Sequence, residues 1–171
     1  ERGAVVAALI LSRQEAIYES EQRLKTQSFE RSIDPGSTAT ADGLLEGAWQ
    51  SHLQDGYTLL VIETVNPDRQ SLRQLASLVE AHMQGEGWWT TAIERGRHLA
   101  VVVATPGMEK LCEAAQRFVR SAEEKGFPVR VGISSSSRQP GGLRHSYQQA
   151  LDALSAATAL HEQQKVHCYD D

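Results

Sequence analysis

The side chains best suited to chemistry in this chain gather in one short polar stretch, Glu94-Arg95-Gly96-Arg97-His98. Arg95 and Arg97 carry forked guanidinium groups, which bind carboxylates and phosphates through paired hydrogen bonds. The stretch separates two apolar runs, WWTTAIE and HLAVVVA, which is the pattern of a β-hairpin. Two interpretations follow: the arginines bind an anionic effector or a partner carboxylate, or they form a solvated turn, which requires no ligand.

The histidines and cysteines form no recognisable metal-binding pattern. The six histidines contain neither an HxH nor an HExxH pair, and Cys112 and Cys168 are too far apart for a CxxC site. His161, His167 and Cys168 could meet at a corner between the last helix and the last strand, although a solvated corner is the simpler interpretation. We expect no metal, no cofactor, and two reduced, mostly buried thiols.

The composition is that of an ordinary globular domain without a basic surface. The 171 residues are 40% hydrophobic and 23% charged, and their formal net charge is −5. Because no surplus of basic residues is available to bind phosphates, we expect this segment to make no direct contact with nucleic acid. The apolar run AVVAALIL (4–11) is too short to span a bilayer, so we expect no membrane anchor and a cytoplasmic location.

Hydrophobic periodicity and turn residues predict an α+β fold. A long helix over residues 4–33 comes first, because this stretch lacks glycine and proline. The later elements give the order β-α-β-β-α-β-α-β, which is that of a ferredoxin-like palm with a mainly antiparallel sheet. We expect the helices to cover one face of that sheet. The expected elements are a helix at 39–53, a strand at 57–65, a helix capped by Asn66-Pro67 and running to Met83, a hairpin at 88–104, a helix opened by Thr105-Pro106 and running to 125, a strand at 128–134, a helix at 143–162 and a strand at 165–169.

The long first helix carries a weak heptad pattern. Ile10, Ile17 and Leu24 recur every seven residues, but the positions that would complete a coiled-coil seam are polar (Arg13, Ser20 and Gln27). Two interpretations stay open. The helix packs on its own domain, or it is a connector that passes a signal from a preceding domain, within a dimer.

Trp88 and Trp89 are consecutive in an expected strand, so their rings should point to opposite faces of the sheet. One ring is expected in the core. The other is a candidate for a protein interface, where exposed tryptophan is enriched, unless it packs under a neighbouring helix.

The C-terminal part of the chain carries a distinctive string of residues. It contains Val131-Gly132-Ile133, Gly141-Gly142, Leu143-Arg144, Ser146-Tyr147, Ala150, Ala153-Leu154 and Tyr169-Asp170-Asp171. This string resembles the end of the GGDEF-like regulatory domain in PucR/CdaR-type bacterial transcriptional regulators. The resemblance implies a connector helix from an upstream sensory domain at residues 1–35 and the GGDEF-like domain at residues 36–171. It also implies a downstream helix-turn-helix outside this chain, so that DNA binding belongs to a longer parent protein.

The resemblance also gives the hairpin a meaning. Active diguanylate cyclases, which share the palm fold, use carboxylates to hold two Mg²⁺ ions on GTP phosphates. The alignment that the resemblance implies places Arg95-Gly96-Arg97-His98-Leu99 where those enzymes have Gly-Gly-Asp-Glu-Phe, so Arg97 and His98 replace the acidic pair. Glu63 is one remaining carboxylate, and Thr158 and Glu162 stand where the enzymes carry a lysine and an arginine. Because one carboxylate cannot hold two metal ions, we expect no catalysis.

Three functions remain to be distinguished. The first is a non-catalytic regulatory domain that forms a homodimer and relays a signal from an upstream sensor to a downstream DNA-binding domain. The second is a sensor that binds a nucleotide or a small metabolite in the degenerate cleft without converting it. The third is a divergent nucleotide cyclase that uses Glu63 and further ligands.

Overall fold

The computed structural model describes residues 2–34, 49–65, 67–104, 107–139, 142–160 and 164–169. The order of helices and strands agrees with the prediction, and the α+β class is confirmed. The elements are α1 (Arg2–Ile33), α2 (Gln50–Leu53), β1 (Thr58–Thr64), α3 (Arg69–Gly85), β2 (Thr90–Arg95), β3 (His98–Val103), α4 (Met108–Glu124), β4 (Val129–Ile133), α5 (Leu143–Leu160) and β5 (Val166–Cys168).

One five-stranded sheet organises the domain, in the order β2-β3-β1-β4-β5. Every pairing is antiparallel except that of β4 with β5. The central strand β1 is buried on both sides along its whole length, apart from the half-buried Glu63. A strand buried on both sides reads as a continuous apolar run, which accounts for the sequence TLLVIET.

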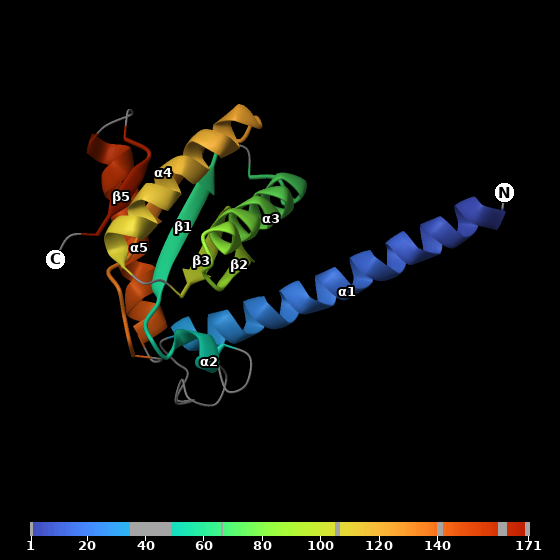
Figure 1. Ribbon diagram of the computed structural model, residues 1–171, viewed down its shortest axis with the longest axis horizontal. Coiled ribbons are helices and arrows are strands. Elements are labelled where there is room, and N and C mark those ends of the chain that lie inside the picture. Colours follow the sequence, from blue (N-terminus) through green and yellow to red (C-terminus); the bar gives the residue numbers. More distant parts are fainter. Residues whose placement is uncertain are drawn as a thin grey trace.

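Helices cover both faces of the sheet, so the expectation of a single covered face was wrong (Figure 1). The helices α3 and α4 pack on the face that carries Leu60 and Ile62, and α5 with the end of α1 packs on the face that carries Leu59 and Val61. The physical reason lies in β1, because an apolar strand exposes hydrophobic surface on each side and each side must be covered.

The helix α1 divides into an attached half and a projecting half. Phe29 and Ile33 are buried in the core beside α5, with the Phe29 ring edge-on to Tyr147 at a centroid distance of 5.6 Å. The first turns extend away from the rest of the domain (Figure 1). Their large apolar side chains, including Leu9 and Ile10, are more than half exposed. Among the described helices, none is long and apolar enough to cross a membrane.

Asp68 starts the helix α3, so the predicted start at Asn66-Pro67 was wrong. The Asp68 carboxylate accepts a hydrogen bond from the Ser71 backbone nitrogen at 3.0 Å and a second from the Ser71 hydroxyl at 2.5 Å. A side-chain acceptor three residues before the amide is the usual N-cap arrangement. Other predicted boundaries lie outside the described residues, namely 39–48, Asn66, Thr105-Pro106 and 161–163.

A disulfide joins Cys112 on α4 to Cys168 on β5, so the expectation of two reduced thiols was wrong. The parallel pairing of β5 with β4 sets Cys168 opposite Ile133, on the face that α4 covers. The two cysteines are 56 residues apart in sequence, and only the tertiary fold brings them together.

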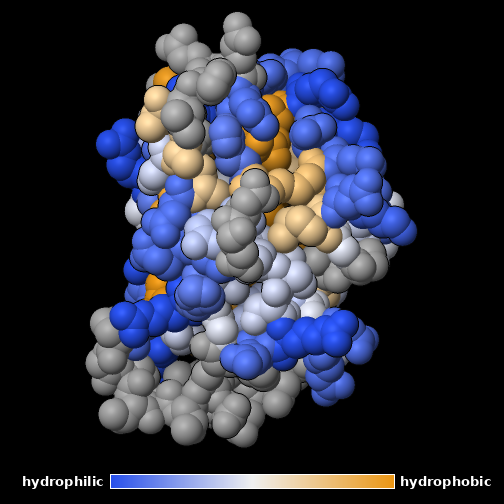
Figure 2. All heavy atoms as spheres, turned by 90° about the vertical axis from the view of Figure 1, so that its left-hand side faces the viewer, coloured by the Kyte–Doolittle hydropathy of each residue, from blue (hydrophilic) through white to orange (hydrophobic). Residues whose placement is uncertain are grey.

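Figure 2 shows that the side of the domain nearest β5 is largely hydrophilic, with a narrower apolar strip between the polar side chains.

Gly132 in β4 allows α5 to lie directly on the sheet. A β-carbon at this position would stand 2.1 Å from the carbonyl oxygen of Ala150 and 2.6 Å from the backbone nitrogen of Leu154. Both contacts are with helix backbone, which cannot rotate away as a side chain can. The position therefore requires glycine because of space, although its backbone conformation is ordinary for a strand.

We expect Gly132→Ala to lower the free energy of unfolding by about 3 kcal/mol or more, because overpacking against backbone has no cheap relaxation. Urea denaturation followed by circular dichroism measures the change. The matched control is Gly85→Ala at the end of α3, where a β-carbon meets nothing within 4 Å. This control should change the free energy by about 1 kcal/mol or less. Equal effects of the two substitutions would contradict the packing argument.

Candidate functional site

A row of four polar residues crosses the sheet at one end, on the face that α5 covers. Arg95 is paired with His98, His98 with Glu63, and Glu63 with Arg130. Residues directly opposite one another on neighbouring strands lie on the same face, with β-carbons about 5 Å apart. These four residues, called the polar row below, bring charges from β2, β3, β1 and β4 together.

Tyr147 of α5 covers one end of the polar row. The Arg95 guanidinium carbon lies 4.7 Å from the centre of the Tyr147 ring, which is a cation–π distance. The Tyr147 hydroxyl lies 3.2 Å from His98 Nε2. The tyrosine therefore engages two of the four side chains and ties the hairpin to α5.

Burial and neighbouring charges act in opposite directions on His98. Burial against α5 lowers the pKa of His98 below its ordinary value of 6.5, because the charged imidazolium is less well solvated there. The Glu63 carboxylate raises the pKa of His98, and the Arg95 guanidinium lowers it. Since the lowering effects prevail, His98 is mostly neutral at pH 7.

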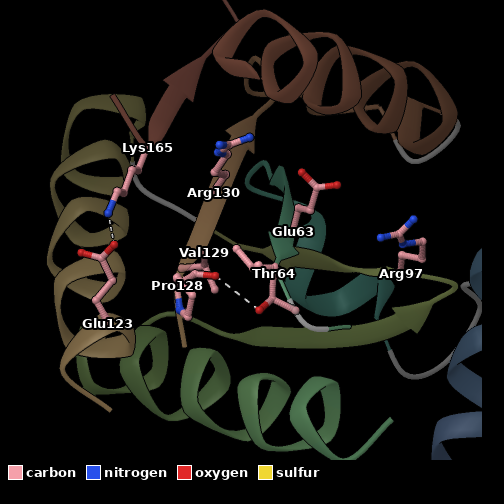
Figure 3. A pocket seen from close by; sticks show the side chains of 9 residues that line it. Glu63, Thr64, Arg97, Glu123, Pro128, Val129, Arg130 and Lys165 are labelled. Carbon is pink, nitrogen blue, oxygen red and sulfur yellow. Dashed lines mark hydrogen bonds and ion pairs between the residues drawn. The ribbon is translucent and has the colours of Figure 1, made fainter. Parts of the chain in front are cut away.

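Two hollows meet at Glu63. The first, called the Arg130 hollow, has a volume of about 310 Å³. Figure 3 shows the side chains around it, with Glu63 and Arg130 on the same side of the sheet and Arg97 further along. Its lining residues are Glu63, Thr64, Val65, Arg97, Glu123, Pro128, Val129, Arg130 and Lys165.

The second, called the Thr158 hollow, lies between the polar row and α5 and has a volume of about 450 Å³. Its polar lining comes from Glu63, His98, Ser155 and Thr158, and its apolar lining from Leu151, Leu154 and Ala159. The Thr158 hydroxyl donates to the carbonyl oxygen of Leu154 at 3.1 Å, so it is engaged within its own helix. This hollow therefore offers a ligand mainly Glu63, His98 and an apolar wall.

The structure brings most of the sequence-predicted site residues together. Glu63, His98 and Thr158 line one hollow, and Glu63 and Arg97 line the other. Gly96 is the first of the two turn residues in the hairpin and has φ +60°. No described non-glycine residue has a positive φ, so the second turn residue, Arg97, has a negative one. This combination is that of a type II′ turn. Glu162 lies outside the described residues.

Arg130, Lys165 and Tyr147 also belong to the site, but sequence reasoning did not assign them to it. A usable signal existed for Arg130, which is the only charged residue in the strand VRVGI. The positions of Lys165 and Tyr147 depend on how β5 and α5 dock, and no local pattern reports that docking.

The proposed interface residues fall into two groups. Trp88 and Trp89 lie against the cores on opposite faces, as strand alternation predicts, and both are half-buried. Trp89 stacks on His52 of α2 at a ring-centroid distance of 4.8 Å, which supports packing under a helix for this residue. Ile10, Ile17 and Leu24 on α1 are instead 53%, 51% and 62% exposed.

Within the described part of the chain, no three histidine, cysteine or acidic side chains are grouped to hold a metal ion. Cys168 is bonded to Cys112, and His161 lies outside the described residues. At the polar row, Glu63 is flanked by His98 and Arg130. A lone carboxylate between basic groups is a poor ligand set for a divalent cation.

The family model described as GGDEF-like domain matches residues 46–156, which is more than half of the 171 residues. The chain belongs to the GGDEF-like domain family. Among solved structures, this GGDEF-like domain is similar to the active GGEEF domain of a diguanylate cyclase from Vibrio cholerae, with a TM-score of 0.54 and 16% sequence identity. The match covers 72% of this chain and 89% of that chain, and at this identity it establishes the palm fold alone. No curated protein matches the sequence.

The GGDEF-like domain should show His98 titrating below pH 6.5, and its two charged neighbours should shift the midpoint in opposite directions. We expect Glu63→Gln to lower the pKa of His98 further, since the carboxylate raises it, and Arg95→Gln to increase the pKa. NMR titration of the imidazole signal, assigned with His98→Gln, measures both shifts. Shifts of the opposite sign would contradict the geometry of the polar row.

The same depression of the pKa has a consequence for stability. As the pH falls, the unfolded chain binds the His98 proton before the folded chain does. Acid therefore favours unfolding, and the stability that depends on a neutral His98 is complete only above about pH 6.5. It is lost as the pH falls through the folded pKa. The free energy of unfolding should therefore fall less on acidification in His98→Gln than in the unchanged protein, as measured by urea denaturation at several pH values.

Proposed function

We propose that this GGDEF-like domain is a non-catalytic regulatory and dimerisation domain of a PucR/CdaR-type bacterial transcriptional regulator. In this proposal residues 1–35 are a connector from an upstream sensory domain, and residues 36–171 pass its signal toward a downstream helix-turn-helix. The observation that carries the proposal is the division of α1, whose last turns are buried in the domain while its first turns project with exposed apolar side chains.

The attachment of α1 combines apolar and polar contacts. Besides Phe29 and Ile33 in the core, Glu19 forms ion pairs with Arg73 at 3.3 Å and Arg69 at 3.6 Å. Lys25 forms an ion pair with Glu80 at 3.6 Å, and the Glu80 carboxylate accepts a hydrogen bond from the Ala92 backbone nitrogen of β2 at 2.8 Å. A change in the position of α1 would therefore be felt by α3 and by the strand that leads into the hairpin.

The contact between α1 and α3 leaves two buried polar atoms without hydrogen bonds, which supports a relay. Gln22 Oε1 and Arg73 Nε are buried there without a hydrogen-bond partner. Such groups cost free energy when buried, so a second seating of α1 that satisfies them would compete with this one. A relay requires two such states that an upstream signal can favour differently.

The hairpin residues beside Glu63 support the absence of catalysis. With Arg97 and His98 at the hairpin, the carboxylate of Glu63 faces basic groups where the family alignment expects an acidic pair. The Arg97 guanidinium repels the divalent cations on which diguanylate synthesis depends, and the single carboxylate of Glu63 cannot hold two of them. The proposal accordingly includes no cofactor and no direct contact of this segment with nucleic acid.

A cytoplasmic location belongs to the same proposal, because a regulator that acts on DNA works there. The disulfide between Cys112 and Cys168 weighs against this location, since reducing cytosols keep most thiols reduced. Thiol labelling of the protein in rapidly quenched cells shows whether the two cysteines are reduced, as a cytoplasmic location predicts, or joined in the disulfide.

The second candidate function is a sensor that binds a nucleotide or a small molecule in the degenerate cleft without converting it. The two hollows that share Glu63 favour it, because their combined lining offers guanidinium, carboxylate and imidazole groups. The remaining candidate, a divergent nucleotide cyclase, requires metal ligands beyond Glu63.

We expect the full chain to form a homodimer through α1. We also expect charged substitutions at the exposed apolar residues of α1 to dissociate the dimer. Ile10→Asp with Ile17→Asp places charges where each apolar side chain is about half exposed in the single chain, and should weaken the dimer at least tenfold. Analytical ultracentrifugation measures the dissociation constant. The control is Val65→Asp, which changes a side chain that is 70% exposed outside α1 and should have no effect. If the unchanged chain is a monomer at every concentration tested, the proposed dimerisation is wrong.

We expect no cyclic or linear dinucleotide when the chain is incubated with GTP or ATP and Mg²⁺ or Mn²⁺. Calorimetric titration with chromatographic analysis of the same samples separates the three candidate functions. Neither heat nor product favours the relay, and saturable heat without product favours the sensor. Metal-dependent product that is lost in Glu63→Ala would establish an enzyme.

A further inference from the structure

We propose that the Arg130 hollow binds a small zwitterion of the α-amino acid class with an apolar side chain. The inference rests on the second candidate function, binding without turnover, and names its ligand. It does not depend on dimer formation through α1, so the two can fail separately.

The charged groups at this hollow are available to a ligand. Lys165 and Glu123 form an ion pair with each other at one edge of the hollow (Figure 3). Among the described residues, Glu63, Arg97 and Arg130 form no ion pair or hydrogen bond through their side chains. Within the part of the chain that the structure describes, one carboxylate and two guanidinium groups around a cavity of about 310 Å³ are therefore unpaired by hydrogen bonds or salt bridges, although Glu63 interacts electrostatically with His98.

The arrangement of these three groups matches a zwitterion. Glu63 and Arg130 are directly opposite in the β1–β4 pairing, so their β-carbons stand about 5 Å apart on one face. Their side chains nevertheless do not meet (Figure 3). An α-amino acid carries an ammonium and a carboxylate on one carbon. It can donate from its ammonium to Glu63 while its carboxylate accepts from the guanidinium of Arg130 or Arg97.

The remaining walls favour an apolar side chain on the ligand. Val65, Pro128 and Val129 line the same hollow, and Val65 is 70% exposed. Contact with Val65 would remove apolar surface from water, which stabilises the complex.

The charged lining of the hollow is of mixed sign, which suits a zwitterion better than a polyanion. Three cations (Arg97, Arg130 and Lys165) and two anions (Glu63 and Glu123) leave one net positive charge. A nucleoside triphosphate carries several negative charges, and the two carboxylates would repel them. A zwitterion has no net charge and can turn its ammonium toward the carboxylates, so it avoids this repulsion.

Calorimetric titration of the full chain with L-valine, L-leucine, L-isoleucine, L-methionine and L-phenylalanine tests the proposal. We expect saturable heat with at least one of them. Removal of either charged group from the ligand should weaken binding at least tenfold. For L-leucine the matched analogues are 4-methylpentanoate, which lacks the ammonium, and 3-methylbutylamine, which lacks the carboxylate.

Two substitutions in the protein make the same test from the other side. Glu63→Gln and Arg130→Gln should each weaken binding at least tenfold, whereas Arg144→Gln, at an exposed position of α5 outside the hollow, should leave it unchanged. The proposal is overturned if none of the five amino acids binds, or if the analogue without an ammonium binds equally well. It is also overturned if GTP or inorganic phosphate binds more tightly than every amino acid. None of these outcomes alters the oligomeric state, which tests the relay separately.

Discussion

The close contact between α5 and the sheet at Gly132 is the constraint on which the rest of the domain depends. The helix backbone lies where a side chain of β4 would otherwise stand, which brings Tyr147 and Leu154 down onto the strands. This approach buries one face of β1, and α3 with α4 buries the other. A central strand covered on both sides then has only one charged side chain to present, Glu63, near the end of the strand where helix cover gives way to the two hollows.

The polar row follows from the register that this packing fixes. A shift of one residue in any pairing would move its member to the opposite face, where α3 and α4 leave no space for a charge. The row is therefore held in place by the apolar residues beside it rather than by its own interactions. Only its Arg95 end is closed, by Tyr147, while Glu63 and Arg130 face the cavity. This division between a closed end and an open end leaves Glu63 and Arg130 as the members of the row that a ligand could reach.

Local signals in the sequence predict the elements, and they fail where tertiary packing decides. Gly96 between two apolar runs predicts the hairpin, and the absence of glycine and proline predicts α1. The apolar run of β1 could have indicated that both faces are covered, but the expected layering did not follow it. The pairing of Cys112 with Cys168 requires the parallel docking of β5, which no local pattern reports. For the site, the chain resemblance pointed to Glu63 and the hairpin, whereas Arg130 becomes part of it only through the β1–β4 register.

The projecting half of α1 has the mechanics of a lever arm. The whole helix has 32 residues, and at 1.5 Å per residue it is about 48 Å long. Roughly half of that length, about 24 Å, extends beyond Tyr18, whose ring centre lies 5.0 Å from the guanidinium carbon of Arg73, and Glu19, which pairs with the same arginine. A tilt of only about 10° at those contacts would then move the tip by about 4 Å, roughly three-quarters of the rise of one helical turn. In a dimer formed through α1, small rearrangements among Arg73, Gln22 and Glu80 would thereby become displacements of the size that changes how two neighbouring helices pack.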